Sequence, residues 1–277
     1  MNQPPKQSRS NVAIGWTILL LVVGSVAYAQ FGHWPFSRPK THTDSGLQSV
    51  LASWSSQHAF DSAVDVHELT GTLRTAAQNS TTQMTTASTY KVYVAYATLH
   101  EVEQGRYTMN SPTRTGQTVS QALSKMILQS DNASAEALGF LVGWNRINSL
   151  AASAGATHTD INNYDSAGNA TNGSKLSTAA DLALMVTKLQ QGNLLSKSHT
   201  DLLLNLMRQQ IWRERVPAGV PAGVTVADKP GWLSNVQNDA AIVYGPKSTY
   251  VLVVMTNGST TQPLADLSRT VYNYLEQ

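Results

Sequence analysis

Residues 88–97 read STYKVYVAYA and combine a polar pair with a continuous apolar run. The residues after Lys91 are apolar on nearly every side of a helix, which predicts a buried central helix. Ser88 and Lys91 are three positions apart, so at the start of this helix they share one face. A desolvated lysine has a lowered pKa and can take the proton of a serine hydroxyl, which is otherwise a poor nucleophile. The stretch therefore predicts a central helix that begins with a candidate nucleophile and its base, although an ordinary helix start has the same spacing.

Strand and helix patterns on both sides of this helix predict the fold class. Asp44 can cap a helix with apolar residues every three to four positions, and residues 264–275 repeat that pattern. Strands are predicted toward the two ends of the chain, at residues 63–69, 225–232, 240–244 and 249–256. Helices are predicted between them, at about residues 88–103, 119–128, 133–141, 144–152, 178–189 and 199–208. We therefore predict an α/β (α+β) fold, with an antiparallel sheet flanked by terminal helices and an inserted all-α lobe at about residues 88–195.

The composition excludes several classes of protein. The 277 residues contain 19 Lys and Arg against 17 Asp and Glu, and no basic patch indicates nucleic-acid binding. There is no cysteine, which excludes disulfides, thiol nucleophiles and zinc–thiolate sites. The seven histidines include no pair at the i, i+3 or i, i+4 spacing of a helical metal site. We therefore expect no metal, no cofactor and no nucleic-acid partner.

The first 43 residues predict export from the cytoplasm. Residues 1–11 form a basic segment with Lys6 and Arg9, and residues 12–31 are a mostly apolar run long enough to span a bilayer. By the positive-inside rule the N-terminus stays in the cytoplasm and the rest of the chain lies outside. The run predicts either a transmembrane anchor or a signal peptide cleaved after Ala29. After a polar linker at residues 32–43 we expect an extracytoplasmic catalytic domain at residues 44–277.

Two further motifs supply polar groups with a possible chemical role. In Ser130-Asp131-Asn132, a second hydroxyl can relay a proton to a leaving nitrogen, and the Asn132 amide can hold both a lysine and a substrate amide. In Lys229-Pro230-Gly231, at the end of a predicted strand, the lysine can attract a substrate carboxylate while Gly231 lets the substrate approach the backbone. Alone, the first motif is more often a helix-capping turn, and the second is typical of a turn.

The three motifs in the order S-x-x-K, S-D-N and K-x-G are far more specific than any one of them. With them, residues 44–277 resemble the class A β-lactamase family, penicillin-recognising serine hydrolases related to D-alanyl-D-alanine carboxypeptidases. The resemblance implies a five-stranded sheet with an all-α lobe. It also implies that Ser88 is acylated, that Lys91 is its proton partner and that Ser130 passes a proton to the leaving nitrogen. Lys229 would orient the substrate carboxylate, and the backbone N–H groups of Ser88 and Trp232 would form the oxyanion hole.

The substrate-binding strand departs from the family pattern at Pro230, and a second departure, Asn238, lies beyond that strand. Pro230 replaces a Thr or Ser whose hydroxyl binds the substrate carboxylate in the family. A proline has no N–H, so we expect this strand at the edge of the sheet, facing a cleft. Asn238 stands where many class A enzymes carry an arginine, and the resemblance implies that Arg215 supplies that guanidinium, although a solvated surface arginine fits the sequence equally well.

A third departure concerns the deacylation step. Class A enzymes carry Glu-x-x-Leu-Asn on an Ω-loop, where the glutamate activates the deacylating water. The matching residues 158–162 read HTDIN, with His158 in the place of the glutamate. His158 is a possible base at neutral pH, and Asp160 and Asp165 are further candidates. We expect instead that water activation is poor.

Three functional hypotheses follow from these residues. We favour an extracytoplasmic serine acyl-hydrolase that acts on a D-alanyl cell-wall peptide and loses a penicilloyl group slowly. The first alternative is a true β-lactamase with a base other than glutamate. The second is a sensor or binding module that penicillin acylates without turnover. All three need a small-molecule or peptide substrate and place the chain at the membrane through its N-terminus.

Overall fold

The computed structural model describes residues 40–162 and 175–277, and residues 41–277 form one compact unit. The predicted basic segment, the apolar run at 12–31 and most of the linker lie outside the described residues. In the part of the chain that the structure describes, no helix is both long enough and apolar enough to cross a membrane. The anchor or signal therefore stays a prediction.

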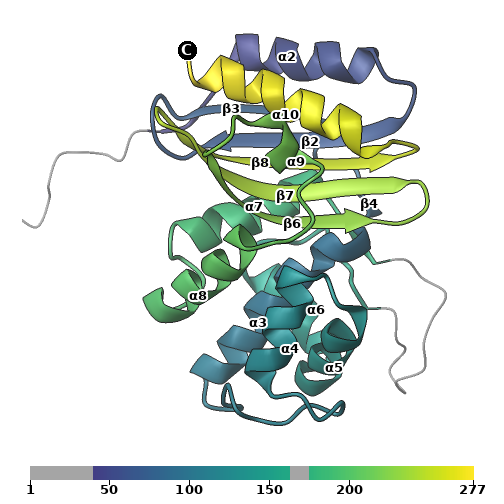
Figure 1. Ribbon diagram of the computed structural model, residues 1–277, viewed down its shortest axis with the longest axis vertical. Coiled ribbons are helices and arrows are strands. Elements are labelled where there is room, and N and C mark those ends of the chain that lie inside the picture. Colours follow the sequence, from purple (N-terminus) through teal and green to yellow (C-terminus); the bar gives the residue numbers. More distant parts are fainter. Residues whose placement is uncertain (1–39, 163–174) are drawn as a thin grey trace, which may run out of the picture. The chain divides into compact units, whose positions relative to one another are not determined.

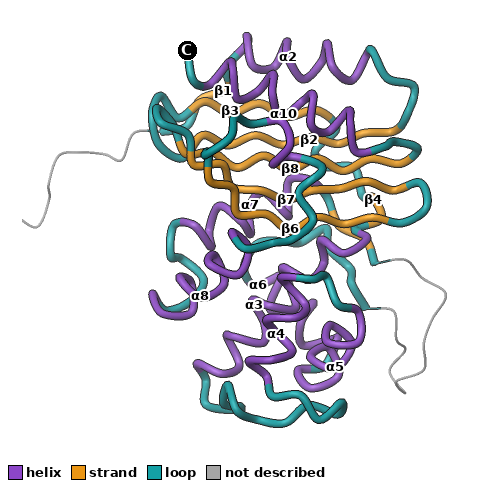
Figure 2. The backbone as a smooth tube through the Cα atoms, in the orientation of Figure 1, coloured by secondary structure: helices purple, strands orange, loops and turns teal. Residues whose placement is uncertain are grey.

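A six-stranded sheet forms the middle layer of this unit (Figures 1 and 2). Its order is β1-β3-β2-β8-β7-β6, and every neighbouring pair is antiparallel except β1 with β3. The strands are β1 (His42–Thr43), β2 (Asp61–Glu68), β3 (Arg74–Gln78), β6 (Thr225–Trp232), β7 (Val236–Tyr244) and β8 (Thr249–Asn257). Strand β6 has the predicted bounds and lies at the edge of the sheet, which accommodates Pro230.

The prediction of five antiparallel strands was wrong at the opposite edge. There β1 comes from residues expected in the linker and pairs with β3 in parallel register. Strand β3 reads RTAAQ and buries only Ala76, so it has no apolar alternation that would reveal a strand. Strand β1 has two exposed residues and no pattern at all.

The terminal helices cover one face of the sheet, as predicted (Figure 1). Helix α2 (Ser45–Ser56) begins at Asp44, whose carboxylate accepts the Leu47 N–H at 2.8 Å. Helix α10 (Thr261–Leu275) buries Leu264, Leu267 and Val271 in the same apolar cluster as α2 and the sheet. The other face of the sheet packs on the helical lobe, so the central strands are buried on both faces.

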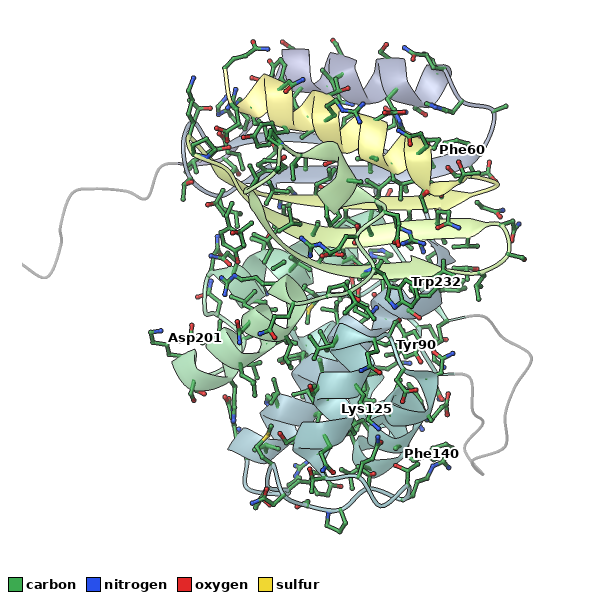
Figure 3. All side chains as sticks on the ribbon, viewed as in Figure 1. Phe60, Tyr90, Lys125, Phe140, Asp201 and Trp232 are labelled. Carbon is green, nitrogen blue, oxygen red and sulfur yellow. The ribbon has the colours of Figure 1, made fainter. Side chains whose placement is uncertain are left out.

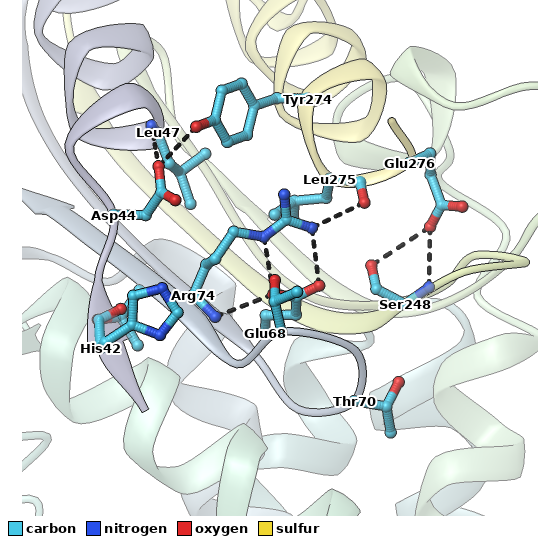
Figure 4. A network of polar contacts seen from close by, with 12 residues as sticks. His42, Asp44, Leu47, Glu68, Thr70, Arg74, Ser248, Tyr274, Leu275 and Glu276 are labelled. Carbon is cyan, nitrogen blue, oxygen red and sulfur yellow. Dashed lines mark hydrogen bonds and ion pairs between the residues drawn. The ribbon is translucent and has the colours of Figure 1, made fainter. Parts of the chain in front are cut away.

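A polar network joins both terminal helices to the sheet (Figure 4). The buried Glu68 of β2 accepts two charge-assisted hydrogen bonds from the Arg74 guanidinium of β3, both at 2.9 Å. The same guanidinium donates to the backbone carbonyl of Leu275 in α10 at 2.9 Å. Tyr274 donates to the Asp44 carboxylate at 2.6 Å. Every charge in this network has a partner, so the network holds α2, α10 and the sheet together.

The helical lobe is built around the predicted central helix. Helix α3 (Lys91–Glu103) is buried on nearly all sides, and the Tyr93 side chain is fully enclosed. Around it lie α4 (Val119–Leu128), α5 (Asn132–Val142), α6 (Trp144–Ser153), α7 (Ala179–Gln190) and α8 (Lys197–Arg208). The short elements β4 (Met84–Thr85), β5 (Leu176–Ser177) and α9 (Val216–Gly219) complete the described fold.

The central helix begins three residues later than predicted. Residues Ala87–Tyr90 form η1, a single 3-10 turn, and Lys91 is the first residue of α3. Ala87 has a φ of 46°, a left-handed conformation that is unfavourable for any residue with a Cβ. Ser88 therefore lies on a tight turn directly before the helix rather than inside it.

Candidate active site

The turn η1 and helix α3 bring Ser88 and Lys91 together. Lys91 is fully buried, and its Nζ lies 3.0 Å from the Ser88 Oγ. Because the 3-10 turn continues directly into α3, the two residues keep the shared face that their spacing predicts. The ammonium group of Lys91 also donates to Asn132 Oδ1 at 2.7 Å, which fixes the position of its side chain.

The S-D-N segment lies between α4 and α5 and faces this pair. Asp131 caps α5 by accepting the Ser134 N–H at 2.7 Å, so the motif is a helix-capping turn, whatever chemistry it has. Ser130 has a φ of 60°, which turns its backbone carbonyl and its hydroxyl toward Lys91, at 2.5 and 3.2 Å from Nζ. Left-handed backbone at a residue other than glycine is typical of functional sites, where the surrounding structure holds the strain.

Strand β6 contributes the second lysine. Lys229 is fully buried, and its Nζ donates to Ser130 Oγ at 2.9 Å and to the Pro230 carbonyl at 2.8 Å. The Ser130 oxygen thus lies between two lysine side chains and accepts from both. A hydroxyl oxygen that accepts two hydrogen bonds has its own O–H left to donate in a third direction. The arrangement suits Ser130 to proton transfer toward a bound molecule.

The two lysines have lowered pKa values because they are buried. Removal from water lowers the pKa of Lys91 to about 8, against the nearby negative charges of Asp131 and Glu136, which raise it. Burial lowers the pKa of Lys229 as well, and the positive charge of Lys91 lowers it further. Two ammonium groups that share Ser130 repel each other, so the neutral form of one lysine becomes accessible near physiological pH.

Gly231 sets the spacing between β6 and the turn that carries Ser88. A Cβ on Gly231 would lie 2.8 Å from the Ser88 nitrogen and 2.9 Å from the Thr89 nitrogen, closer than real contacts allow. The backbone N–H of Leu233 donates to Val236 on β7, so the N–H of its neighbour Trp232 points the other way, off the edge of the sheet. The turn that carries the Ser88 N–H therefore lies close to β6, next to the Trp232 N–H that points off the edge of the sheet.

Arg215 lies next to Trp232 rather than on the open surface. The side chain is only 5% exposed, and its guanidinium lies 5.2 Å from the centroid of the Trp232 ring. It donates twice to Gln237 Oε1, at 2.6 and 3.0 Å, and burial lowers its pKa. The structure therefore excludes the solvated arginine. Asn238 is fully buried and joins β4 to β7 by donating to the Thr85 carbonyl at 2.8 Å.

Behind Lys229 lie two buried carboxylates that the sequence analysis did not single out. Asp228 on β6 and Asp239 on β7 are fully buried, and one oxygen of each has no hydrogen-bond partner among the described residues. The other oxygens accept from Arg213 at 2.6 Å and from the Val216 N–H at 3.1 Å. Burial raises the pKa of both carboxyl groups, and their mutual repulsion raises that of Asp228 further.

Neither described candidate for a deacylation base joins the network of Ser88. The His158 side chain is 63% exposed, and its Nδ1 lies 3.9 Å from Asp181. Its backbone N–H donates to the same Asp181 at 2.8 Å. Asp160 accepts from the Asn148 side chain and is exposed. Asp165 lies outside the described residues.

One carboxylate close to Lys91 was missed. Glu136 is one helical turn after Asn132 on α5, and its charge raises the pKa of Lys91 and of Lys175. The i, i+4 spacing from Asn132 was the available signal, because Asn132 itself was predicted to hold the lysine. In the described ranges 40–162 and 175–277, no group of three His, Asp or Glu side chains is placed to hold a metal ion.

Comparisons with known proteins identify the family and agree with the fold. Residues 46–275 match the sequence model of the Beta-lactamase enzyme family. The structure of PBP-A superposes with a TM-score of 0.79 at 23% identity, covering 87% of this chain and 99% of that one. A mutant of PBP-A, solved as an acyl-enzyme complex with penicillin G, gives 0.78 at 24% identity, covering 86% and 99%. The β-lactamase of Sphaerobacter thermophilus gives 0.74 at 21% identity, covering 84% and 97%. A search of curated proteins gives no match.

Proposed function

Because the chain belongs to the β-lactamase enzyme family, we propose that it is an extracytoplasmic serine acyl-hydrolase that forms an acyl-enzyme on Ser88. The observation that carries the proposal is the hydrogen-bonded chain from Ser88 through Lys91 and Ser130 to Lys229. Such a series of hydrogen bonds can remove the proton of the attacking serine hydroxyl and deliver a proton to the leaving nitrogen of the amide.

Acylation follows from these contacts. Neutral Lys91 takes the proton of Ser88, whose Oγ forms a bond to the carbonyl carbon of the substrate amide. The negative charge that develops on the carbonyl oxygen is stabilised by the N–H groups of Ser88 and Trp232. As the carbon–nitrogen bond breaks, Ser130 donates its proton to the leaving nitrogen and recovers one from Lys91, which is now protonated. Lys229 binds the substrate carboxylate, and the Asn132 amide holds the acyl-side amide.

The substrate that fits this site best is a cell-wall peptide ending in D-alanine. A hydrolytic water must attack the ester from a side that the leaving group has vacated, and a bulky penicilloyl group obstructs that approach more than a small peptidyl group does. The described partners of Lys91 are neutral oxygens, and His158 faces solvent and Asp181. Without a positioned general base, deacylation is slower by about 10²–10⁴-fold. We therefore infer slow loss of penicillin from Ser88.

The decisive experiment mixes the full-length chain with a labelled penicillin and follows the intact mass of the protein. We expect one adduct per chain, formed within minutes and lost much more slowly, and no adduct on Ser88→Ala. Labelling of Ser88→Ala at the wild-type rate would remove the catalytic assignment. Rapid multiple turnover of penicillin would favour a true β-lactamase, and an adduct without any hydrolysis of D-alanyl peptides would favour a sensor or binding module.

A second variant tests the deacylation step alone. His158→Glu places a carboxylate where the family carries one, so we expect faster adduct loss with an unchanged rate of adduct formation. The control is His42→Glu on the exposed strand β1, at the edge of the sheet opposite β6. If the wild type already hydrolyses penicillin rapidly and His158→Ala abolishes this while acylation persists, His158 is the base.

The extracytoplasmic location rests on the residues before the domain. Lys6 and Arg9 precede the apolar run at 12–31, which favours a cytoplasmic N-terminus with the domain outside. On intact cells or spheroplasts, added protease should therefore cleave the chain beyond about residue 38 while a cytosolic marker stays protected. Protection of the domain together with that marker would contradict the location.

A further inference from the structure

A pocket of about 770 Å³ lies at the end of the sheet where β6 turns into β7, and its lining includes Leu233, the neighbour of Trp232 in the candidate active site. The C-terminal end of α2, the adjoining ends of β2, β3 and β8, the short strands β4 and β5, and the β6–β7 turn all line it. Its volume is within the range of pockets that enclose small-molecule ligands. In Figure 3 the labelled Phe60, which lines the pocket, and Trp232 lie at the same end of the sheet.

We propose that this pocket binds the remote acyl end of the substrate, and that it selects an uncharged, amide-rich peptide segment. The inference rests on the proposed function, because it assumes that Lys229 binds the substrate carboxylate and that the Trp232 N–H binds the reacting carbonyl. It goes beyond that function by naming where the rest of the acyl donor lies and which chemistry it has.

The direction of β6 leads the acyl chain into the pocket. Lys229 and Trp232 are three residues apart on the same strand, which is about 10 Å at the usual rise. A substrate anchored at both points therefore runs along β6 from its carboxylate toward its acyl side. The next residues in that direction, Leu233 and Asn235, line the pocket. Thr85 lines it from the other side, three residues before Ser88.

Side-chain amides line much of the pocket and suit a peptide backbone. Asn235 donates to Asn257 Oδ1 at 2.8 Å, which leaves the Asn257 amide N–H groups and the Asn235 carbonyl oxygen for a ligand. Gln83 uses its N–H group in a backbone contact at 2.8 Å, which leaves its carbonyl oxygen. The lining thus offers donors and acceptors together, as an extended peptide requires.

The charge of the lining disfavours an acidic ligand, although one histidine, His58, also lines the pocket. Of the described residues that line the pocket, none is a lysine or an arginine, and Asp61 is an exposed carboxylate. Phe60 and Leu233 add apolar surface, and Leu233 is 52% exposed, as expected for a side chain that a bound ligand covers. A neutral segment avoids both the desolvation of an added charge and repulsion from Asp61.

The test compares penicillin reagents that differ only in their acyl group. One carries an acetyl group on the 6-amino nitrogen, the second a neutral tetrapeptide and the third a tetrapeptide with two glutamates. The second-order rate of adduct formation on the full-length chain is measured by intact mass. We expect the neutral peptide reagent to react about tenfold faster than the acetyl reagent, the size of effect that one or two added neutral hydrogen bonds produce. The acidic reagent should have no such advantage.

The double variant Gln83→Ala/Asn257→Ala should reduce that advantage to about twofold or less and leave the rate with the acetyl reagent unchanged. Asn205→Ala on α8 is the matched control and should keep the full advantage. Equal rates for the neutral and acetyl reagents in the wild type, an advantage that survives in the double variant, or a preference for the acidic reagent would each overturn the inference. Failure of all three reagents to label Ser88 would instead overturn the proposed function on which the inference rests.

Discussion

Two buried polar networks of this protein use charge in opposite ways. In the network of Glu68 and Arg74, at the far edge of the sheet, a carboxylate and a guanidinium are paired through two hydrogen bonds at 2.9 Å (Figure 4). In the network of Ser88 and Ser130, two lysines share hydroxyl and carbonyl oxygens, and all their described hydrogen-bond partners are neutral. Glu68 in the first network and both lysines in the second are buried, and only the first network pairs its charges.

The consequence of this difference is seen in the pKa values. Hydrogen bonds from Arg74 lower the pKa of Glu68 although burial opposes this, so both groups stay charged and the pair is purely structural. Burial without a carboxylate partner lowers the pKa of Lys91 to about 8, so its charge can change at physiological pH. The opposite charges of Glu68 and Arg74 therefore stabilise the fold, whereas the two neighbouring lysines, Lys91 and Lys229, allow one amine to act as a base.

The largest effect is expected from removing the base of the second network. Lys91→Ala should slow acylation of Ser88 by penicillin at least about 10²-fold, because a positioned general base contributes that much or more. The variant should fold, since a buried lysine with neutral partners adds little to stability. Stopped-flow or quenched-mass kinetics with far-UV circular dichroism test both statements. Acylation at the wild-type rate by a folded Lys91→Ala would remove the lysine from the mechanism.

Breaking the network of Glu68 and Arg74 should lower the stability of the protein and leave the rate of acylation nearly unchanged. Arg74→Ala leaves the Glu68 carboxylate buried without its partner, so we expect the free energy of unfolding to fall by about 2–3 kcal/mol. The rate of acylation by penicillin should stay within about twofold of the wild type. Lys197→Ala, which breaks an exposed pair with Asp201, is the control and should cost less than about 0.5 kcal/mol. A large loss of acylation in folded Arg74→Ala would show that the two networks are coupled.

The buried carboxylates behind Lys229 give a smaller effect with a definite pH dependence. Burial raises the pKa of Asp239 in the folded state above its ordinary value of 3.8. Between the ordinary pKa and the raised pKa, the folded state binds more protons than the unfolded state, so the free energy of unfolding falls as the pH rises. Asp239→Asn keeps an acceptor for the Val216 N–H and removes the titration. We expect it to stabilise the protein by about 1–2 kcal/mol at neutral pH and by much less near pH 4. A gain that does not vary with pH in denaturant melts would contradict this account.

The smallest effect is expected at Glu136, whose charge raises the pKa of Lys91. Glu136→Gln should lower that pKa further and move the pH midpoint of acylation down by roughly half a pH unit, the size expected for a charge pair near the surface. Glu103→Gln at the opposite end of α3 is the matched control and should leave the midpoint in place. A midpoint that moves upward in Glu136→Gln would show that Glu136 acts on Ser88 by another route.

The sequence predicted the parts of the site that depend on local spacing. Ser88 and Lys91 lie within one turn, and the S-D-N segment caps α5, so each motif is visible without tertiary information. Strand β6 has the predicted bounds, residues 225–232. The resemblance assigned roles to Ser130 and Lys229, whereas the contacts of Lys91 and Lys229 with Ser130 are seen only in the structure.

The features that the sequence did not predict depend on strand register and backbone strain, which local sequence patterns do not show. Asp228 and Asp239 are neighbours only because of the pairing of β6 with β7. The left-handed backbone at Ala87 and Ser130 is imposed by tertiary packing on residues that rarely adopt it, so the late start of α3 had no sequence signal. The short edge strand β1 and the half-buried β3 were missed because neither has an apolar face.

The central claim is that burial makes Lys91 a neutral base for Ser88, and the pH dependence of acylation tests it most directly. The second-order rate of penicillin adduct formation should rise with pH and level off, with a midpoint near the Lys91 pKa of about 8, because only the neutral amine can accept the proton of Ser88. A rate that does not change between about pH 6 and about pH 9, or one that rises only near the ordinary lysine value of 10.5, would contradict the claim.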